Sequence, residues 1–123
     1  MEKKIQVTIK NITENNVDSN VYNSTMKNDE IIYLEGDKTS VLLNIKNNFS
    51  IFRKNDEIRM KLNFELGKKI KGEYFLKKYS QFINVCTYTK KYENEKNYIY
   101  IEYDLILGID IISSYIYELN ILN

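Results

Sequence analysis

The amino-acid sequence predicts an all-β fold, a single antiparallel β-barrel of about 8 to 10 strands, with residues 1–123 as one domain. Three observations support this prediction. The 18 Ile, 11 Tyr, 6 Thr, 5 Val and 5 Phe make 45 of 123 residues, and these types suit the pleated, half-buried surface of a sheet. Alanine, the best helix former, is absent. Apolar and polar residues alternate with a period of two along the chain.

The alternation marks the expected strands in chain order. The clearest candidates are Ile5/Val7/Ile9, Val41/Leu43/Ile45, Ile58/Met60/Leu62/Phe64, Ile83/Val85/Thr87 and Ile99/Ile101/Tyr103/Leu105/Leu107. Between residues 57 and 65 the apolar side chains interleave with Arg59, Lys61 and Asn63, so one face should look inward and the other should face water. This pattern is typical of an antiparallel sheet with one solvated face.

Turn-forming residues separate these runs at the spacing of hairpins. They are Asn15-Asn16, Asn28-Asp29, Gly36-Asp37, Asn47-Asn48, Lys54-Asn55-Asp56, Gly67 and Gly108. Exposed strand edges promote association, and the chain has no proline to protect them. We therefore expect a closed barrel, which removes most edges.

The composition excludes several kinds of chemistry and indicates a compartment. Without His, the chain has no Ser-His-Asp or Cys-His nucleophile pair and no zinc site with imidazole ligands. Cys86 is the only cysteine, so no disulfide forms within the chain. Residues 1–7 do not lead into the apolar core of a signal peptide, and the apolar stretch 105–122 is interrupted by polar residues and Gly108. We expect a soluble cytoplasmic protein without cofactor, metal or membrane partner.

A series of landmarks follows one another from about Glu30 onward. They are Ile31-Ile32-Tyr33-Leu34, Thr39, Arg53, Met60, Phe64, Gly67, Tyr74, the pair Thr87 and Thr89, and Ile101-x-Tyr103-Asp104-Leu105 with Gly108. In this order and spacing the chain resembles the YwiB-like family, a bacterial domain of unknown function. The resemblance implies a calycin-like (lipocalin-like) β-barrel and no particular activity. Two features depart from the family: the loop after Leu34 is shorter, and Asn55, which can still take a left-handed turn, stands where a Gly is usual.

Arg53 is the first candidate site residue. It shares its phase with Phe49 and Ile51, so its side chain should point toward the interior or the mouth of the barrel. A guanidinium in that place is suited to binding a carboxylate or a phosphate. Two structural roles stay open at this point, because Arg53 can also reach water from the strand end or pair with an internal acid.

Tyrosines on inward phases are the second candidate feature. Tyr74, Tyr103, Tyr115 and Tyr117 combine an apolar ring with a hydroxyl, which suits the wall of a small-molecule site. Gly72 is also on an inward phase, and its missing side chain would leave room for a ligand. The alternative is that the tyrosines fill the core and that Gly72 marks a β-bulge.

Glu102 and Asp104 are the main acid-base pair that the composition leaves open. They lie two residues apart on one face of a strand, at a separation of about 7 Å. That face is opposite to the apolar phase, so we expect both carboxylates to be solvated, without the raised pKa that an acid catalyst needs. No catalytic or metal-binding residue is therefore predicted.

Two surface features suggest partners. The hairpin region 68–78 combines Lys68, Lys69, Lys71, Lys77 and Lys78 with aromatic residues, as in proteins that bind single-stranded nucleic acid, although a net charge of only +1 favours ordinary solvation. The turn that holds Ile109, Ile111 and Ile112 should expose an apolar patch for a protein partner or a homodimer contact.

These features together predict a non-enzymatic barrel that binds a small apolar or anionic ligand. The expected ligand-binding residues are Arg53, Gly72, Tyr74, Tyr103 and Tyr117. The alternative function is a protein- or nucleic-acid-interaction module that uses region 68–78 or the loop Ile109–Ile112.

Overall fold

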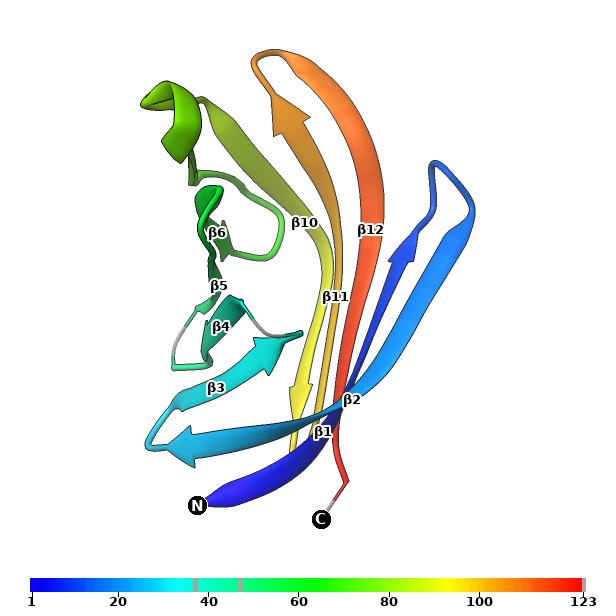
Figure 1. Cartoon of the computed structure of the whole chain (residues 1–123). Helices are drawn as coiled ribbons and strands as arrows, with labels where there is room; N and C mark the ends of the chain where they lie inside the picture. Colours follow the sequence, from blue (N-terminus) through cyan, green and yellow to red (C-terminus); the bar gives the residue numbers. More distant parts are fainter. Residues whose placement is uncertain (37, 47, 123) are drawn as a thin grey trace.

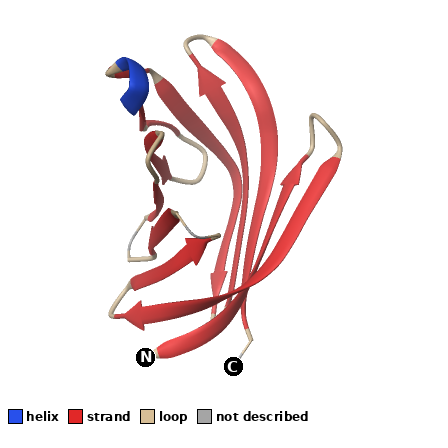
Figure 2. Ribbon diagram, viewed as in Figure 1, coloured by secondary structure: helices blue, strands red, loops and turns tan. Residues whose placement is uncertain are grey.

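The structure is a computed structural model that describes residues 1–36, 38–46 and 48–122. The described residues form twelve strands and one short 3-10 helix (Figure 2). All twelve strands belong to one antiparallel sheet, which curls so that its two halves face each other (Figure 1). The predicted all-β barrel fold is confirmed.

The strands vary widely in length. They are β1 (Glu2–Asn11), β2 (Asn16–Lys27), β3 (Glu30–Glu35), β4 (Thr39–Asn44), β5 (Phe49–Lys54), β6 (Ile58–Phe64), β7 (Lys69–Lys71), β8 (Glu73–Leu76), β9 (Gln81–Ile83), β10 (Val85–Glu95), β11 (Tyr98–Leu107) and β12 (Asp110–Ile121), with the helix η1 (Lys77–Tyr79) between β8 and β9. Their order across the sheet is β7-β10-β11-β12-β1-β2-β3-β4-β5-β6-β8-β9.

The number of strands exceeds the predicted 8 to 10. The strands β7, β8 and β9 have only three or four residues each, so they are too short to show a clear alternation. The first six residues of β2 are exposed on both faces, and this part of the strand has no inward apolar set that a sequence pattern can reveal.

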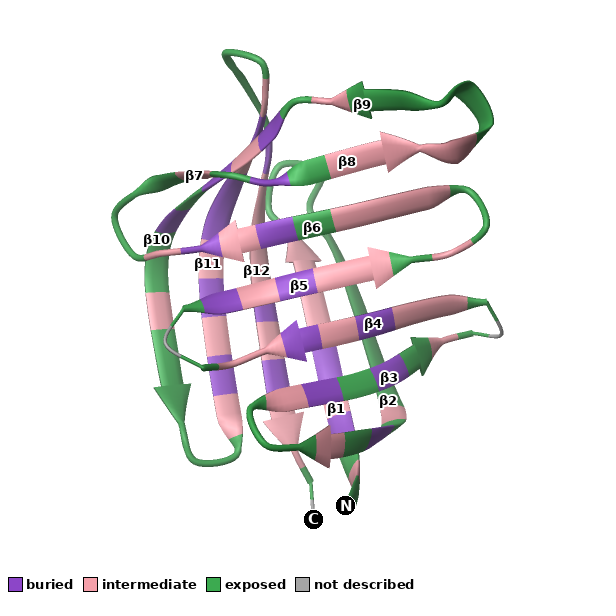
Figure 3. Ribbon diagram, turned by 90° about the vertical axis from the view of Figure 1, so that its left-hand side faces the viewer, coloured by how far each residue is buried: buried purple, intermediate pink, exposed green. Residues whose placement is uncertain are grey.

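The predicted alternation corresponds to burial (Figure 3). Along β4 and β5, Val41, Leu43, Phe49 and Ile51 are buried, while the residues between them are half-buried. The same alternation continues on the facing wall in β11 with Ile99, Ile101 and Tyr103. These inward side chains from both walls form one hydrophobic core.

Most of the predicted turns adopt the expected left-handed backbone. Asn15, Asn28, Gly36, Gly67 and Gly108 all have a positive φ between 55° and 73°. The predictions at Asp37 and Asn47 lie outside the described residues.

Asn55 does not adopt the left-handed turn that its residue type allows. Asn55 is not among the described residues with a positive φ. Its side-chain oxygen instead accepts hydrogen bonds from the backbone N–H groups of Glu57 and Ile58, at 2.8 and 2.9 Å. The side chain therefore stabilises this turn without the left-handed backbone that a glycine would supply.

The two ends of the curled sheet approach each other along a seam between β6 and the strands β7 and β10. Strand β7 pairs with β10 and leads through Gly72 directly into β8, which pairs with β6. Across the seam, the Asn63 side-chain amide donates to the Lys71 carbonyl at 3.1 Å, and the buried Thr87 hydroxyl donates to the Asn63 carbonyl. Side-chain hydrogen bonds thus replace part of a regular strand ladder at this position.

Candidate ligand-binding site

Two adjoining hollows lie inside the barrel, between β5, β6 and β8 on one wall and β11 and β12 on the other. The first, which we call the arginine hollow, has a volume of about 180 Å³ and takes its polar lining from Arg53, Tyr103, Tyr115 and Tyr117. The second, the apolar hollow, has a volume of about 250 Å³ and is lined by Tyr74, Leu76, Ile83, Val85 and Leu107. Met60 and Leu105 line both hollows, so the two spaces are neighbours.

Away from these hollows, the largest core side chains pack against one another in a region that we call the packed end of the core. Phe49 and Phe64 are fully buried there, with ring centroids 5.8 Å apart, and Phe49 also packs against Tyr92 and Tyr117. Two more open depressions, of about 350 and 360 Å³, border this region, one beside Phe49 and Phe64 and the other beside Ile99.

Arg53 points inward, as its phase predicts, and pairs with Glu35 of β3. The Arg53 Nη2 atom donates a hydrogen bond to Glu35 Oε2 at 3.0 Å, and Nε lies 2.9 Å from Oε1. This Nε–Oε1 approach is electrostatic only: its angle does not meet hydrogen-bond geometry, so the buried Nε has no hydrogen-bond partner among the described residues. Of the roles that the sequence left open, the structure shows pairing with an internal acid.

Several tyrosine hydroxyls surround this ion pair. Tyr33 and Tyr117 approach each other with their hydroxyl oxygens 3.2 Å apart in a buried hydrogen bond. Tyr103 stacks on Tyr115 of the neighbouring strand, with ring centroids 5.5 Å apart and planes 25° apart. Burial raises the pKa of Tyr33 to about 12 and also raises the pKa values of Tyr103 and Tyr117, so these three hydroxyls stay protonated at neutral pH.

The structure brings four of the five predicted site residues to the hollows. Arg53, Tyr103 and Tyr117 line the arginine hollow, and Tyr74 lines the apolar hollow. Gly72 lies outside both, at the junction of β7 and β8. A Cβ at this position would collide with the Lys61 carbonyl oxygen of β6, so Gly72 permits a close approach of two backbones. Its predicted role of leaving room for a ligand does not match this geometry.

Sequence reasoning missed Glu35, Met60 and Leu105 as parts of the site. Glu35 follows Ile31 and Tyr33 at intervals of two, so the phase count that places Arg53 inward also places Glu35 inward. Met60 and Leu105 were expected as core residues. That they line hollows depends on how the two walls of the barrel pack, which a sequence pattern does not show. 

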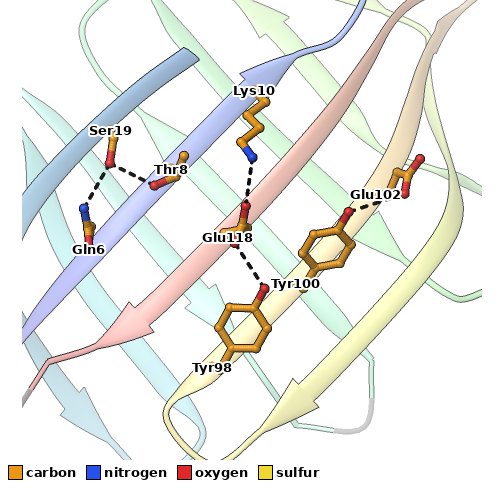
Figure 4. Close-up of polar contacts among 8 residues, drawn as sticks. All are labelled: Gln6, Thr8, Lys10, Ser19, Tyr98, Tyr100, Glu102 and Glu118. Atoms are coloured by element: carbon orange, nitrogen blue, oxygen red, sulfur yellow. Dashed lines mark hydrogen bonds and ion pairs between the residues drawn. The ribbon is translucent and has the colours of Figure 1, made fainter.

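The outer face of β1, β2, β11 and β12 carries polar contacts instead (Figure 4). Tyr98 donates to Glu118 at 3.1 Å, Lys10 lies 3.5 Å from the same carboxylate, and Thr8 and Ser19 share a hydrogen bond of 2.9 Å. Tyr100 donates to Glu102 on this face at 3.5 Å. The outer face thus has the polar character that the alternation predicts.

The pair Glu102 and Asp104 lies on this outer face, but Asp104 is not solvated as predicted. It is 8% exposed, beneath Lys90 at 2.9 Å, and it accepts a hydrogen bond from the Ser114 hydroxyl at 2.6 Å. Burial alone would raise the pKa of Asp104, but the hydrogen bonds from Ser114 and Lys90 outweigh burial and lower it. Asp104 is therefore held ionised, which does not suit a general acid.

The two surface features predicted from the sequence differ in their contacts: lysines of region 68–78 have protein partners, whereas the isoleucines near residue 109 are exposed to solvent. In the basic region 68–78, Lys68 pairs with Glu65 at 2.8 Å, and the Lys77 ammonium donates to the Asn55 carbonyl at 2.7 Å. Ile109 is 93% exposed, and Ile111 and Ile112 are also exposed. Ile111 and Ile112 belong to β12, so the hairpin is longer than the predicted turn.

The described part of the chain contains no group of three or more His, Cys, Asp or Glu residues that could hold a metal ion. It also contains no helix with the length and apolar character needed to cross a membrane.

Comparisons with known proteins agree with the fold described above. Among solved structures, the chain is similar to the ywiB protein from Bacillus subtilis, with 14% sequence identity and a TM-score of 0.66 over 99% of this chain and 94% of that chain. At this identity the likeness shows the fold alone. A comparison with curated proteins found no match. The model of a family described as a domain of unknown function (DUF1934) matches residues 2–119. The YwiB-like resemblance is thereby confirmed, and the chain belongs to the DUF1934 family.

Proposed function

We propose that this protein is a non-enzymatic, cytoplasmic binding protein that holds a small molecule in the two adjoining hollows. The observation that carries the proposal is the pair of adjoining hollows around Met60 and Leu105, where apolar walls meet the guanidinium of Arg53. Small-molecule sites are concave and mostly apolar, with a few polar groups that orient the ligand. The arginine hollow and the apolar hollow combine these two properties.

Accessibility supports the same proposal. Most residues that line the apolar hollow, among them Tyr74, Leu76 and Leu107, are half-buried, whereas Phe49 and Phe64 are fully buried. A ligand at this end would therefore cover apolar surface that water now reaches. Burial of that surface would stabilise the complex by roughly 25 cal/mol per Å².

The substitution Leu105→Trp tests the proposal, because Leu105 lines both hollows. We expect the wild-type protein to retain a small molecule through purification and native mass spectrometry to show its added mass, while Leu105→Trp shows the bare chain. Leu34→Trp is the matched control, since Leu34 is 57% exposed on the outer phase of β3 and its replacement should leave the bound mass unchanged. A wild-type protein without bound mass, whose melting temperature also stays constant with a panel of small apolar acids and alcohols, would contradict the proposal.

A homodimer through Ile109, Ile111 and Ile112 is the second candidate function. It is favoured by the 93% exposure of Ile109 next to two further exposed isoleucines, because such apolar patches commonly form protein contacts. We expect the wild-type protein to sediment as a dimer at high concentration and the Ile109→Ser/Ile111→Ser variant as a monomer. A wild-type protein that sediments as a monomer at all concentrations rules out this contact. The nucleic-acid alternative stays a prediction, and a gel-shift that weakens as salt is raised would support it.

A further inference from the structure

Tyr103 brings a hydroxyl without a protein partner to the arginine hollow. The residue is 7% exposed and lines the hollow, and its hydroxyl forms no hydrogen bond with any residue that the structure describes. The same holds for the hydroxyl of Tyr115, which lies beside it and is half-buried. Neither hydroxyl oxygen is itself buried. Both hydroxyls are therefore free to donate a hydrogen bond to a ligand in the hollow.

Arg53 adds further donors to the same hollow. Glu35 occupies Nη2, the buried Nε has no hydrogen-bond partner among the described residues, and Nη1 likewise forms no hydrogen bond within the described part of the chain. A guanidinium can donate five hydrogen bonds and accept none. The missing partner in the arginine hollow is thus an acceptor. 

The charge of Glu35 limits which acceptor fits. Because the carboxylate of Glu35 already balances the guanidinium of Arg53, the pair has no net charge. Any anion therefore adds uncompensated negative charge beside Glu35, and a single carboxylate adds half as much as a group with two negative charges. A carboxylate can accept from the N–H groups of Arg53 that Glu35 does not occupy. An ammonium group would face the hydrogen-bond donors of Arg53.

The size and lining of the apolar hollow define the rest of the ligand. Tyr74, Leu76, Ile83, Val85 and Leu107 supply its wall, without a charged side chain. At roughly 30 Å³ for each water-sized group, the two hollows together hold a molecule of about a dozen non-hydrogen atoms. This size corresponds to a carboxyl group with a short alkyl chain or a single aromatic ring.

We propose that the ligand is a small amphipathic monocarboxylic acid, with its carboxylate at Arg53, Tyr103 and Tyr115 and its apolar body between Met60 and Leu107. This inference rests on the proposed function, which requires only that some small molecule binds in the hollows. It adds the orientation of the ligand and the preference for an acid.

Isothermal titration calorimetry at pH 7 with octanoate, octan-1-ol and octylamine tests the inference, because these probes share one chain and differ in the head group. We expect octanoate to bind about tenfold more tightly than octan-1-ol and octylamine to bind most weakly. Tyr103→Phe removes only the unpartnered hydroxyl and should weaken octanoate about fivefold while it changes octan-1-ol less than twofold. Glu35→Gln should strengthen octanoate, because it frees the guanidinium from its internal partner.

The matched control is Tyr88→Phe, which removes a hydroxyl from the outer face of β10 and should change no affinity. Equal affinities for octanoate and octan-1-ol, or an equal loss of both in Tyr103→Phe, would overturn the preference for an acid and leave the proposed function intact. If none of the three probes binds and native mass spectrometry shows no bound mass, both proposals fail.

Discussion

Replacing Phe49 with alanine is expected to lower the free energy of unfolding by about 4 kcal/mol. Phe49 is fully buried, and its ring packs against Phe64, Tyr92 and Tyr117 at centroid distances of 5.8, 6.4 and 6.1 Å. The substitution removes the ring from the packed end of the core and leaves a cavity that the surrounding rings cannot fill. Urea denaturation should show a lower midpoint with an unchanged slope.

Phe52 provides the matched control, because it lies on the opposite face of β5 and is half-buried. Phe52→Ala should cost about 1 kcal/mol, in line with most substitutions outside a core. Equal losses of stability in Phe49→Ala and Phe52→Ala would show that the packed end does not dominate the stability of the barrel.

Replacing Gly72 with alanine is expected to destabilise the protein by about 3 kcal/mol. The new Cβ would collide with the Lys61 carbonyl oxygen, which is backbone and cannot rotate away. The strands must separate at the seam, so the hydrogen bond from Gly72 N–H to the Val85 carbonyl, 2.8 Å in the structure, should weaken as well. Thermal denaturation measures the loss of stability, and hydrogen exchange at Gly72 reports the opening of the seam.

Glu73→Ala serves as the control, because Glu73 is the adjacent residue, is exposed and already has a Cβ. It should change the melting temperature by less than a quarter of the Gly72→Ala effect. A Gly72→Ala protein with wild-type stability would mean that β6 and β8 can move apart without cost, and the close approach would then have no structural role.

The sequence predicted strands such as β4, β6 and β11 because their environment is simple, whereas the 12-residue strands β2 and β12 were not among the clear candidates. In β5 and β11 one face meets the core and the other faces outward, so burial has the same period as the pleat. The short strands β7 and β9 were missed because they hold three residues each, and their position is decided by the partner strand. The seam could not be predicted, since it depends on a side-chain contact between Thr87 and the Asn63 carbonyl, 24 residues apart in the chain.

The candidate site was predicted in part, because the period of two also shows which side chains of a strand point inward. The phase of Arg53, Tyr103 and Tyr117 was sufficient to place them inside the barrel. Phase alone does not tell whether an inward glycine faces a cavity or a neighbouring backbone, and Gly72 faces a backbone. The presence of a hollow depends on the volume left between two walls, which is set by the curvature of the whole sheet and by no local pattern.

The pairing of β1 with β12 affects how the chain folds during synthesis. Val7 lies opposite Leu119 and Ile5 opposite Ile121, and both Val7 and Leu119 belong to the core. β1 therefore leaves the ribosome more than a hundred residues before the strand that completes this wall. Until then only the hairpin with β2 can form on it, and contacts of such long sequence separation form slowly. One edge of β1 therefore has no strand partner until β12 has been synthesised.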